Sequence, residues 1–176
     1  MNIVQYMIDQ SWRDDKKEER KVMLFNMARE GKEKEDIASK IGTMLLYNQV
    51  IEEMLKDIVQ LSINYIKAEI WPSEVYMSFE FSKSTFGAII KGFEQYATIE
   101  YNRDILLKSL DRYNKQRNEV VHNLFSIKDL NKLAKELDEY ALDAEEIIGL
   151  LVEYDGAVCE KFEDLATRVD FKVLEE

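Results

Sequence analysis

Residues 36–70, DIASKIGTMLLYNQVIEEMLKDIVQLSINYIKAEI, decide the fold of this chain. Apolar side chains recur there at alternating intervals of three and four residues, which is the spacing of a buried helix face. The stripe consists of Met44, Tyr47, Ile51, Met54, Ile58, Leu61 and Tyr65. Pro72 follows Trp71 and ends the pattern, because proline lacks the amide hydrogen that a helix needs. The spacing therefore predicts one long helix over 36–70.

An aromatic segment, VYMSFEF at 75–81, follows and alternates with period two. A single strand would have no pairing partner here, so we interpret this segment as an ordered loop packed on the helices. Contact with a partner protein is the alternative. A shorter helix is predicted next, from Ser84 as N-cap candidate to about Tyr96.

Two longer helical segments complete the pattern. The first spans about 102–125. The second has Ser126 or Asp129 as its N-cap candidate and carries an apolar stripe up to Leu165. Within it, Asp155-Gly156 predicts a bend or a boundary between two helices.

Six glycines and one proline in 176 residues leave few chain breaks, which favours long helices. We therefore expect an all-α fold, an antiparallel helical bundle of four to six helices in a single domain over 1–176. Residues 34–170 form its predicted core and 1–33 a helical extension. Within the extension, 2–12 is amphipathic. The charge run at 14–21 is expected to be a solvated helical face rather than an interaction tail.

No run of about eighteen apolar residues is present, and the first twelve residues lack the basic start and apolar core of a signal peptide. We expect a cytoplasmic protein with no membrane partner. The single cysteine, Cys159, cannot form an internal disulfide, and we expect a buried or half-buried residue rather than a reactive thiol. No Cys/His cluster indicates a metal site, and no cofactor is expected.

The segment Arg117-Asn118-Glu119-Val120-Val121-His122 contains the only histidine of the chain. Histidine takes and gives protons near neutral pH, and arginine binds anions. Together with a polar orienting residue such as Asn118, these side chains fit phosphate-ester chemistry. At 100° per residue, Arg117 falls inside an apolar line on its helix. That line consists of Leu106, Leu110, Tyr113, Val121 and Leu124.

An arginine in an apolar seam is costly unless its charge is paired or the seam opens onto a partner or ligand. Asn114, Asn118 and His122 form the adjacent column, and Lys108, Arg112 and Lys115 lie just beyond it. The simpler interpretation remains open. In it, Arg117 pairs with Glu119 or an acid of the last helix, and His122 is a surface residue that the helix dipole favours.

The net charge of −11 argues against nonspecific nucleic-acid binding, so any such role needs a local patch. The chain segregates its charge. Residues 102–125 hold five basic and three acidic side chains, a local charge of +2, whereas 128–169 hold five basic and twelve acidic ones, a local charge of −7. The motif lies on the basic part, where the local potential attracts anions.

The motif and the helical layout around it resemble HEPN domains (higher eukaryotes and prokaryotes nucleotide-binding). That family's motif is an arginine, four to six residues, and a histidine, with a polar residue after the arginine. Arg117, Asn118 and His122 meet it with a spacing of four. The motif covers six residues, and the layout extends the resemblance over most of 36–169.

The resemblance implies a metal-independent endoribonuclease, commonly a homodimer whose motif helices face each other. It implies His122 as general acid or base, Arg117 as stabiliser of charge on the phosphate, and Asn118 as orienting residue. The products would be a 2′,3′-cyclic phosphate and a 5′-hydroxyl. RNA contacts would come from Lys108, Arg112, Asn114 and Lys115. A toxin neutralised by an antitoxin partner, a phage-defence nuclease and a host RNA-processing factor all fit.

Two other classes stay open. One is a non-catalytic HEPN-like module for binding or dimerisation. The other is an acidic helical regulator that captures a basic partner, which the −7 balance after Lys128 favours. Metal-dependent hydrolysis is disfavoured, because Glu52-Glu53 and a single histidine do not supply a ligand set.

Overall fold

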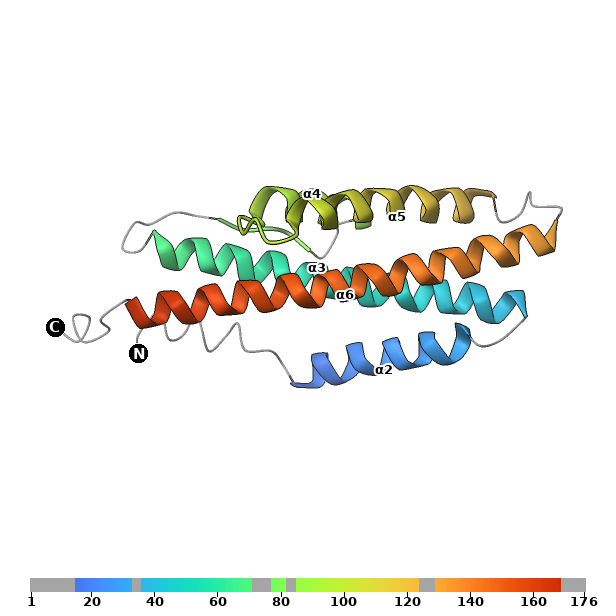
Figure 1. The fold of residues 1–176 in the computed structure, drawn as a ribbon, viewed down its shortest axis with the longest axis horizontal. Helices are drawn as coiled ribbons and strands as arrows, with labels where there is room; N and C mark the ends of the chain where they lie inside the picture. Colours follow the sequence, from blue (N-terminus) through green and yellow to red (C-terminus); the bar gives the residue numbers. More distant parts are fainter. Residues whose placement is uncertain (1–14, 33–35, 71–76, 82–84, 124–128, 169–176) are drawn as a thin grey trace.

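A computed structural model of the chain describes residues 15–32, 36–70, 77–81, 85–123 and 129–168. These residues form five α-helices and no strand, which confirms the all-α helical bundle (Figure 1). The helices are α2 (Asp15–Lys32), α3 (Ile37–Glu69), α4 (Phe86–Tyr96), α5 (Arg103–Asn123) and α6 (Leu130–Arg168). None of them is both long and apolar enough to cross a bilayer. The predicted amphipathic segment 2–12 lies outside the described residues.

The long helices α3 and α6 form the middle layer, with α2 on one side and α4 and α5 on the other (Figure 1). Contacts between α3 and α6 keep a constant register. Lys40 bonds Asp138, the Tyr47 hydroxyl donates to Glu145, and Tyr65 packs on Phe162. In these three contacts the residue number in α3 and the residue number in α6 rise together, so the two helices run parallel. The predicted antiparallel arrangement applies to the sequence neighbours α2–α3 and α5–α6.

The parallel pair is possible because the connection after α3 returns the chain to the middle of the bundle. Phe86, at the start of α4, packs on Tyr113 of α5. Tyr113 stacks on Tyr140, whose hydroxyl donates to Asn48 in the middle of α3. Phe93, near the end of α4, packs on Tyr154 further along α6. Helix α4 therefore runs in the same direction as α3 and α6.

The segment 77–81 is irregular and packs on α4, as predicted for the aromatic loop; 75–76 lie outside the described residues. The Phe79 ring lies against Gly92 and Tyr96. A Cβ on Gly92 would come within 2.7 Å of the Phe79 ring, so only glycine allows this approach.

The helix caps follow the expected chemistry with one change. Asp36 caps α3 by accepting from the Ser39 amide at 2.8 Å. Thr85, rather than the predicted Ser84, caps α4 and accepts from Ala88 at 3.3 Å. Asp129, one of the two predicted cap candidates of α6, accepts from the backbone amides of Asn131 and Lys132 and therefore caps this helix. Ser84 and Ser126 lie outside the described residues.

Of the predicted bend or helix boundary at Asp155-Gly156, the boundary is wrong, because α6 continues through both residues. Tyr154 and Val158 are buried on either side of Gly156. Their burial offsets the cost of about 1 kcal/mol for a glycine inside a helix. The expectation of a buried or half-buried Cys159 is also wrong, since this side chain is exposed on α6 next to buried Val158.

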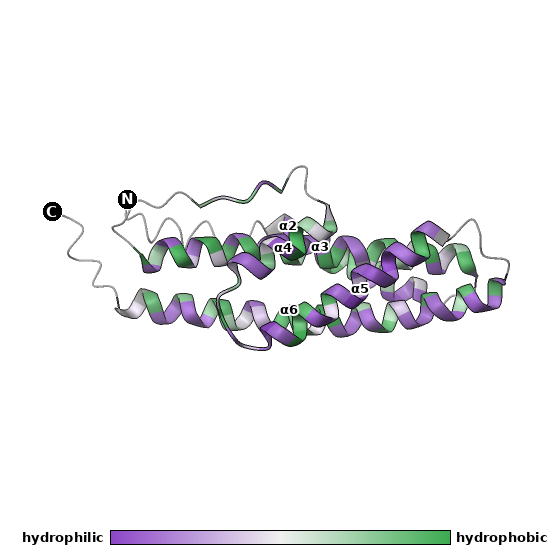
Figure 2. Cartoon of the chain, turned by 90° about the horizontal axis from the view of Figure 1, so that it is seen from above, coloured by the Kyte–Doolittle hydropathy of each residue, from purple (hydrophilic) through white to green (hydrophobic). Residues whose placement is uncertain are grey.

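Helix α2 is part of the core of the bundle, although 1–33 was predicted to be an extension outside that core. Leu24 and Ala28 are buried in the same cluster as the α3 and α6 stripes. The charge run is not solvated throughout, because Lys17 and Lys21 bond Asp57 of α3. Figure 2 shows hydrophobic and hydrophilic residues alternating along α3 and α6, as expected for helices that bury one face.

Candidate functional site

The motif lies in the last two turns of α5, and polar contacts fix the start of this helix. Arg103 donates from Nε to the Ala97 carbonyl and from a terminal nitrogen to the Glu94 carbonyl, both at 2.6 Å. Asn102 has a φ of 50°, a left-handed conformation that asparagine tolerates. Its side-chain amide donates to the carboxylate of Glu153 of α6 at 3.2 Å. These bonds fix the direction of α5 and therefore where the motif points.

Arg117 is half-buried at the contact between α5 and α4. Its guanidinium carbon lies 5.6 Å from the centroid of the Phe86 ring, a cation–π distance. Its Nε is fully buried and makes no hydrogen bond to any described residue. Arg117 also forms no ion pair within the described ranges, and Glu119 is exposed. The predicted placement in the apolar seam is confirmed, without the carboxylate pairing that the simpler interpretation required.

A buried tyrosine pair lies next to Arg117. Tyr113 and Tyr140 are almost fully buried, and their rings stack with centroids 4.3 Å apart. Burial raises the pKa of both hydroxyls, while the positive charge of Arg117 acts in the opposite direction. The Tyr140 hydroxyl donates to Asn48 Oδ1 at 2.5 Å. The arginine is therefore held beside rigid aromatic groups and not beside an acid.

The column beside the seam turns progressively toward solvent. Asn114 is half-buried next to Gly87 of α4, whereas Asn118 and His122 are exposed. The apolar line was predicted to continue through Val121, and this is wrong, because Val120 is buried and Val121 is exposed. The predicted Leu124 lies outside the described residues. His122 therefore stands on an open surface at the end of α5.

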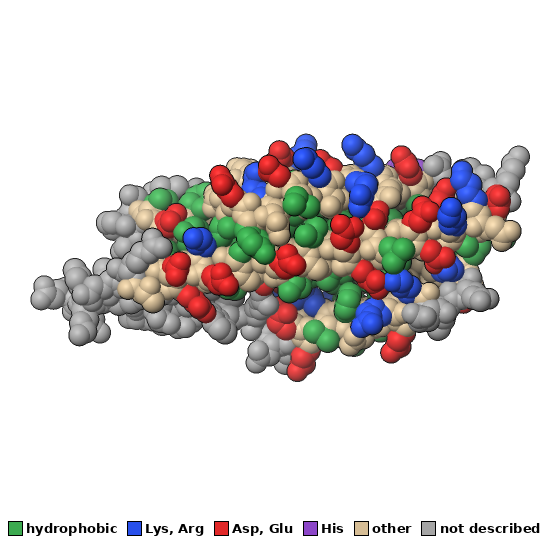
Figure 3. Space-filling model, viewed as in Figure 1, with side chains coloured by type: hydrophobic (Ala, Val, Ile, Leu, Met, Phe, Trp, Pro, Cys, Tyr) green, Lys and Arg blue, Asp and Glu red, His purple; other side chains and the backbone are tan. Residues whose placement is uncertain are grey.

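Of the predicted RNA contacts, Lys108 and Lys115 are exposed on α5. Arg112 instead pairs with two acids of α6, Asp143 at 3.1 Å and Glu146 at 3.7 Å. Figure 3 shows basic side chains mixed with acidic ones over α5, and mainly acidic ones along α6. The positive potential that the sequence predicted for α5 is thus partly neutralised by its neighbour.

His122 follows Arg117 by five positions, which places their side chains about 140° apart around the helix and about 7.5 Å apart along it. Arg117 faces α4, and His122 faces solvent. One copy of the chain therefore does not direct both groups at the same atom. The described residues include no group of three or more His, Cys, Asp or Glu side chains arranged to hold a metal ion.

The sequence did not reveal the role of Phe86. Its position at the start of α4 gave no sign that it would meet Arg117, because that contact depends on how α4 packs on α5. A comparison with protein-family models found no match, and neither did comparisons with curated proteins and with solved structures. The resemblance to HEPN domains therefore rests on the six-residue motif and the order of the helices.

Proposed function

We propose that this protein is a metal-independent endoribonuclease of HEPN type. The observation that carries the proposal is Arg117, a half-buried arginine that Phe86 holds in place and that has no carboxylate partner among the described residues. An arginine in such a setting retains its capacity to bind a phosphate by two parallel hydrogen bonds. A structural arginine of a helical bundle is expected to have an acidic partner instead.

In the proposed reaction, His122 removes the proton of the ribose 2′-hydroxyl or protonates the 5′-leaving oxygen. Arg117 stabilises the charge that builds on the phosphate during attack. Asn118, exposed one turn before His122, orients the phosphate or the imidazole ring. The bond between phosphorus and the 5′-oxygen breaks as the bond to the 2′-oxygen forms. The products are a 2′,3′-cyclic phosphate and a 5′-hydroxyl.

The active form in this proposal is a homodimer that pairs two α5 helices. The chain has one histidine, and in one copy it points away from Arg117. A second α5 facing the first would supply a second imidazole near the same phosphate, so that one acts as base and the other as acid. Lys108, Lys115 and Asn114 would contact the RNA beside the motif. Arg112 would do so only by giving up Asp143.

The biological setting belongs to the same proposal. In this proposal the protein acts in the cytoplasm. Three roles there would use the activity: a toxin held inactive by a protein antitoxin, a phage-defence nuclease, or an RNA-processing factor. The alternative of an acidic regulator keeps the support of the −7 balance after Lys128, but it does not gain the support that a carboxylate partner of Arg117 among the described residues would have given. The non-catalytic HEPN-like module is the outcome that the following experiment would favour if no cleavage occurs.

The test is cleavage of total RNA in buffer containing EDTA. We expect the wild-type chain to cleave and the variants Arg117→Ala and His122→Ala to lose at least about a hundredfold in rate, the usual contribution of one acid–base group. Arg20→Ala is the matched control, because Arg20 is an exposed arginine of α2 outside the motif. Equal rates in His122→Ala and wild type would contradict the proposal.

A further inference from the structure

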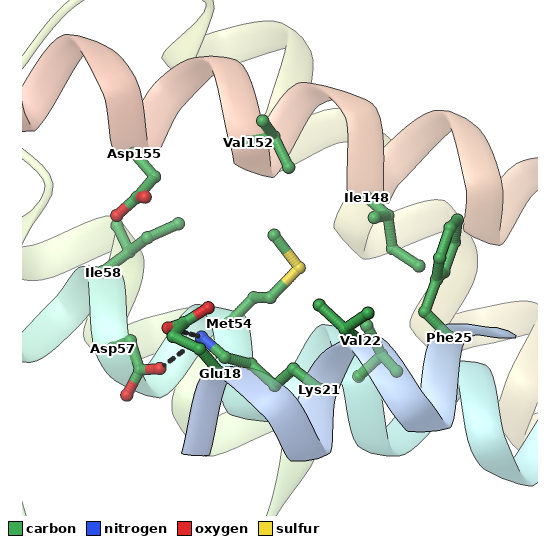
Figure 4. Close-up of a pocket in the computed structure, with 11 residues that line it drawn as sticks. Glu18, Lys21, Val22, Phe25, Met54, Asp57, Ile58, Ile148, Val152 and Asp155 are labelled. Carbon is green, nitrogen blue, oxygen red and sulfur yellow. Dashed lines mark hydrogen bonds and ion pairs between the residues drawn. The ribbon is translucent and has the colours of Figure 1, made fainter. Parts of the chain in front are cut away.

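A half-open groove lies between α2, α3 and α6, on the side of the bundle away from the motif, and its lining is mainly apolar (Figure 4). Its volume is about 250 Å³. Protein interiors are close-packed and contain few voids larger than a water molecule. An engineered apolar cavity of about 150 Å³ is already large enough to hold benzene. The groove therefore has room for apolar side chains of a further segment.

Two exposed valines flank the opening of the groove. Val22 of α2 and Val152 of α6 both line it, and each is 58% exposed. Figure 4 shows Phe25 and Ile148 together at one end, with Met54 between them and the charged side chains. Single exposed apolar side chains are common, but these two continue an apolar cavity. Together they form an apolar surface that faces solvent.

The charged side chains of the groove form pairs with one another. Asp57 accepts from both Lys17 and Lys21. Lys21 also pairs with Glu18 at 2.7 Å. These pairs leave the apolar part of the groove to decide what fits there.

The groove lies along the first half of α2. Its lining residues on this helix run from Glu18 to Phe25, a distance of about 10 Å at 1.5 Å per residue. Near its other end α2 joins α6 directly, since Lys32 donates to Glu145 at 2.6 Å. Helix α2 begins at Asp15, one turn before Glu18. The chain that precedes α2 is therefore tethered beside the groove.

That preceding chain carries a segment of matching chemistry. Residues 2–12, NIVQYMIDQSW, contain one charged side chain, Asp9, and lie outside the described residues. Their sequence predicts an amphipathic helix, because apolar residues recur at intervals of three and four. The apolar face consists of Ile3, Val4, Met7 and Ile8. At 100° per residue, Gln5 and Asp9 fall on the opposite face.

The length of the segment also fits the groove. Eleven residues in a helix extend about 16 Å, enough to cover a groove of about 10 Å. Residues 13–14 remain for the connection, and helix–helix connections of about two to eight residues are usual in bundles. The segment can therefore turn back before Asp15 and lie antiparallel to α2.

We propose that residues 2–12 of this chain fold back and dock in the groove as a helix. Their apolar face packs against Val22, Met54 and Val152, and their polar face stays in water. The contact is favourable because it removes apolar surface of both partners from water. The inference goes beyond the ribonuclease activity and does not depend on it, since no residue of α5 lines the groove.

The test measures how fast a thiol at the groove opening reacts with N-ethylmaleimide in the full chain. Cys159→Ser removes the native thiol, and Val152→Cys places one at the opening. We expect Ile8→Asp to raise the reaction rate about tenfold, because a charge on the docking face opposes burial. Gln5→Asp is the matched control, since it introduces the same charge on the opposite face, and it should leave the rate unchanged.

A second thiol position separates docking from a general loss of structure. Leu142 lies on the same helix, is 57% exposed and does not line the groove, so the rate at Leu142→Cys should not respond to Ile8→Asp. An equal rise at both thiols would overturn the proposal, and so would equal rates at Val152→Cys in Ile8→Asp and Gln5→Asp. A rate at Val152→Cys that rises on dilution would also overturn it, because a second copy would then be the occupant.

Discussion

The guanidinium of Arg117 lies over the ring of Phe86, with its central carbon 5.6 Å from the ring centroid, and thereby joins α5 to α4. The contact holds a positive charge at a half-buried position without an acidic partner in the described part of the chain. A cation–π contact is worth about 0.5–2 kcal/mol, which does not fully offset the loss of hydration of an unpaired arginine. Stability alone therefore does not account for an arginine at this position.

The first prediction separates function from stability at this residue. Arg117→Leu keeps an apolar side chain against Phe86 and removes the buried, unbonded Nε. We expect the free energy of unfolding in urea to stay within about 1 kcal/mol of wild type or to rise, because no partner is left unpaired. RNA cleavage should be lost. A loss of more than about 2 kcal/mol would instead indicate a structural role.

Two glycines provide a matched pair for packing. Gly92→Ala brings a Cβ within 2.7 Å of the Phe79 ring, so we expect a loss of about 1–3 kcal/mol in the free energy of unfolding. Gly149→Ala is the control inside α6, where a Cβ meets nothing within 4 Å. That substitution should add about 0.5–1 kcal/mol, since alanine favours a helix interior. Thermal unfolding of both variants measures the difference, and changes of the same sign would contradict the described packing.

The link between α2 and α3 is concentrated at Asp57. Its carboxylate bonds both Lys17 and Lys21, and Lys21 is nearly buried. Asp57→Asn should lower the free energy of unfolding by about 1–3 kcal/mol, because it leaves Lys21 partly unpaired in a buried place.

Glu139→Gln is the control for this change. It breaks an exposed pair with Lys135 at 3.7 Å and should cost less than about 0.5 kcal/mol. Hydrogen exchange should show faster opening of α2 in Asp57→Asn alone. Equal exchange rates of α2 amides in the two variants would show that Asp57 does not anchor this helix.

Buried tyrosines make the fold sensitive to alkaline pH. Burial raises the pKa of Tyr47, Tyr113 and Tyr140, and it raises that of Tyr154 to about 12. A group whose pKa is raised by folding contributes stability that is complete below its unfolded value, about 10 for tyrosine, and is lost as the pH rises through the folded value. We therefore expect full stability up to pH 10 and unfolding between pH 10 and about 12.

Tyrosinate absorbance during an alkaline titration measures this effect. The buried hydroxyls should ionise together with the loss of helical circular dichroism, because each is shielded from solvent only while the chain is folded. Ionisation of all tyrosines near pH 10 in a chain that stays folded would contradict the burial of these rings.

The sequence predicted the helices well where the signal is local. The three-and-four spacing over 36–70 corresponds to the observed α3, and Asp129 was correctly among the cap candidates of α6. The predicted helix boundary at Asp155-Gly156 is absent because burial of the side chains around Gly156 outweighs the low helix propensity of glycine. Propensity is a local quantity, and tertiary packing decided this case.

The candidate site was also predicted where the signal is local and missed where it depends on contacts between helices. Helical periodicity was enough to place Arg117 in an apolar seam and His122 near solvent. It did not reveal Phe86 as the neighbour of Arg117, nor that Arg112 pairs with Asp143, because both contacts join residues of different helices. The parallel course of α3 and α6 was equally hidden, since it depends on where the chain re-enters the bundle at Phe86.

The chemistry of the RNA ends after cleavage in EDTA is the most direct test of the proposed ribonuclease activity. The proposal predicts a 2′,3′-cyclic phosphate and a 5′-hydroxyl from the wild-type chain, no cleavage of RNA carrying 2′-O-methyl groups, and neither product from His122→Ala. Fragments that end in a 3′-hydroxyl and a 5′-phosphate, or the same cyclic phosphate from His122→Ala, would contradict it.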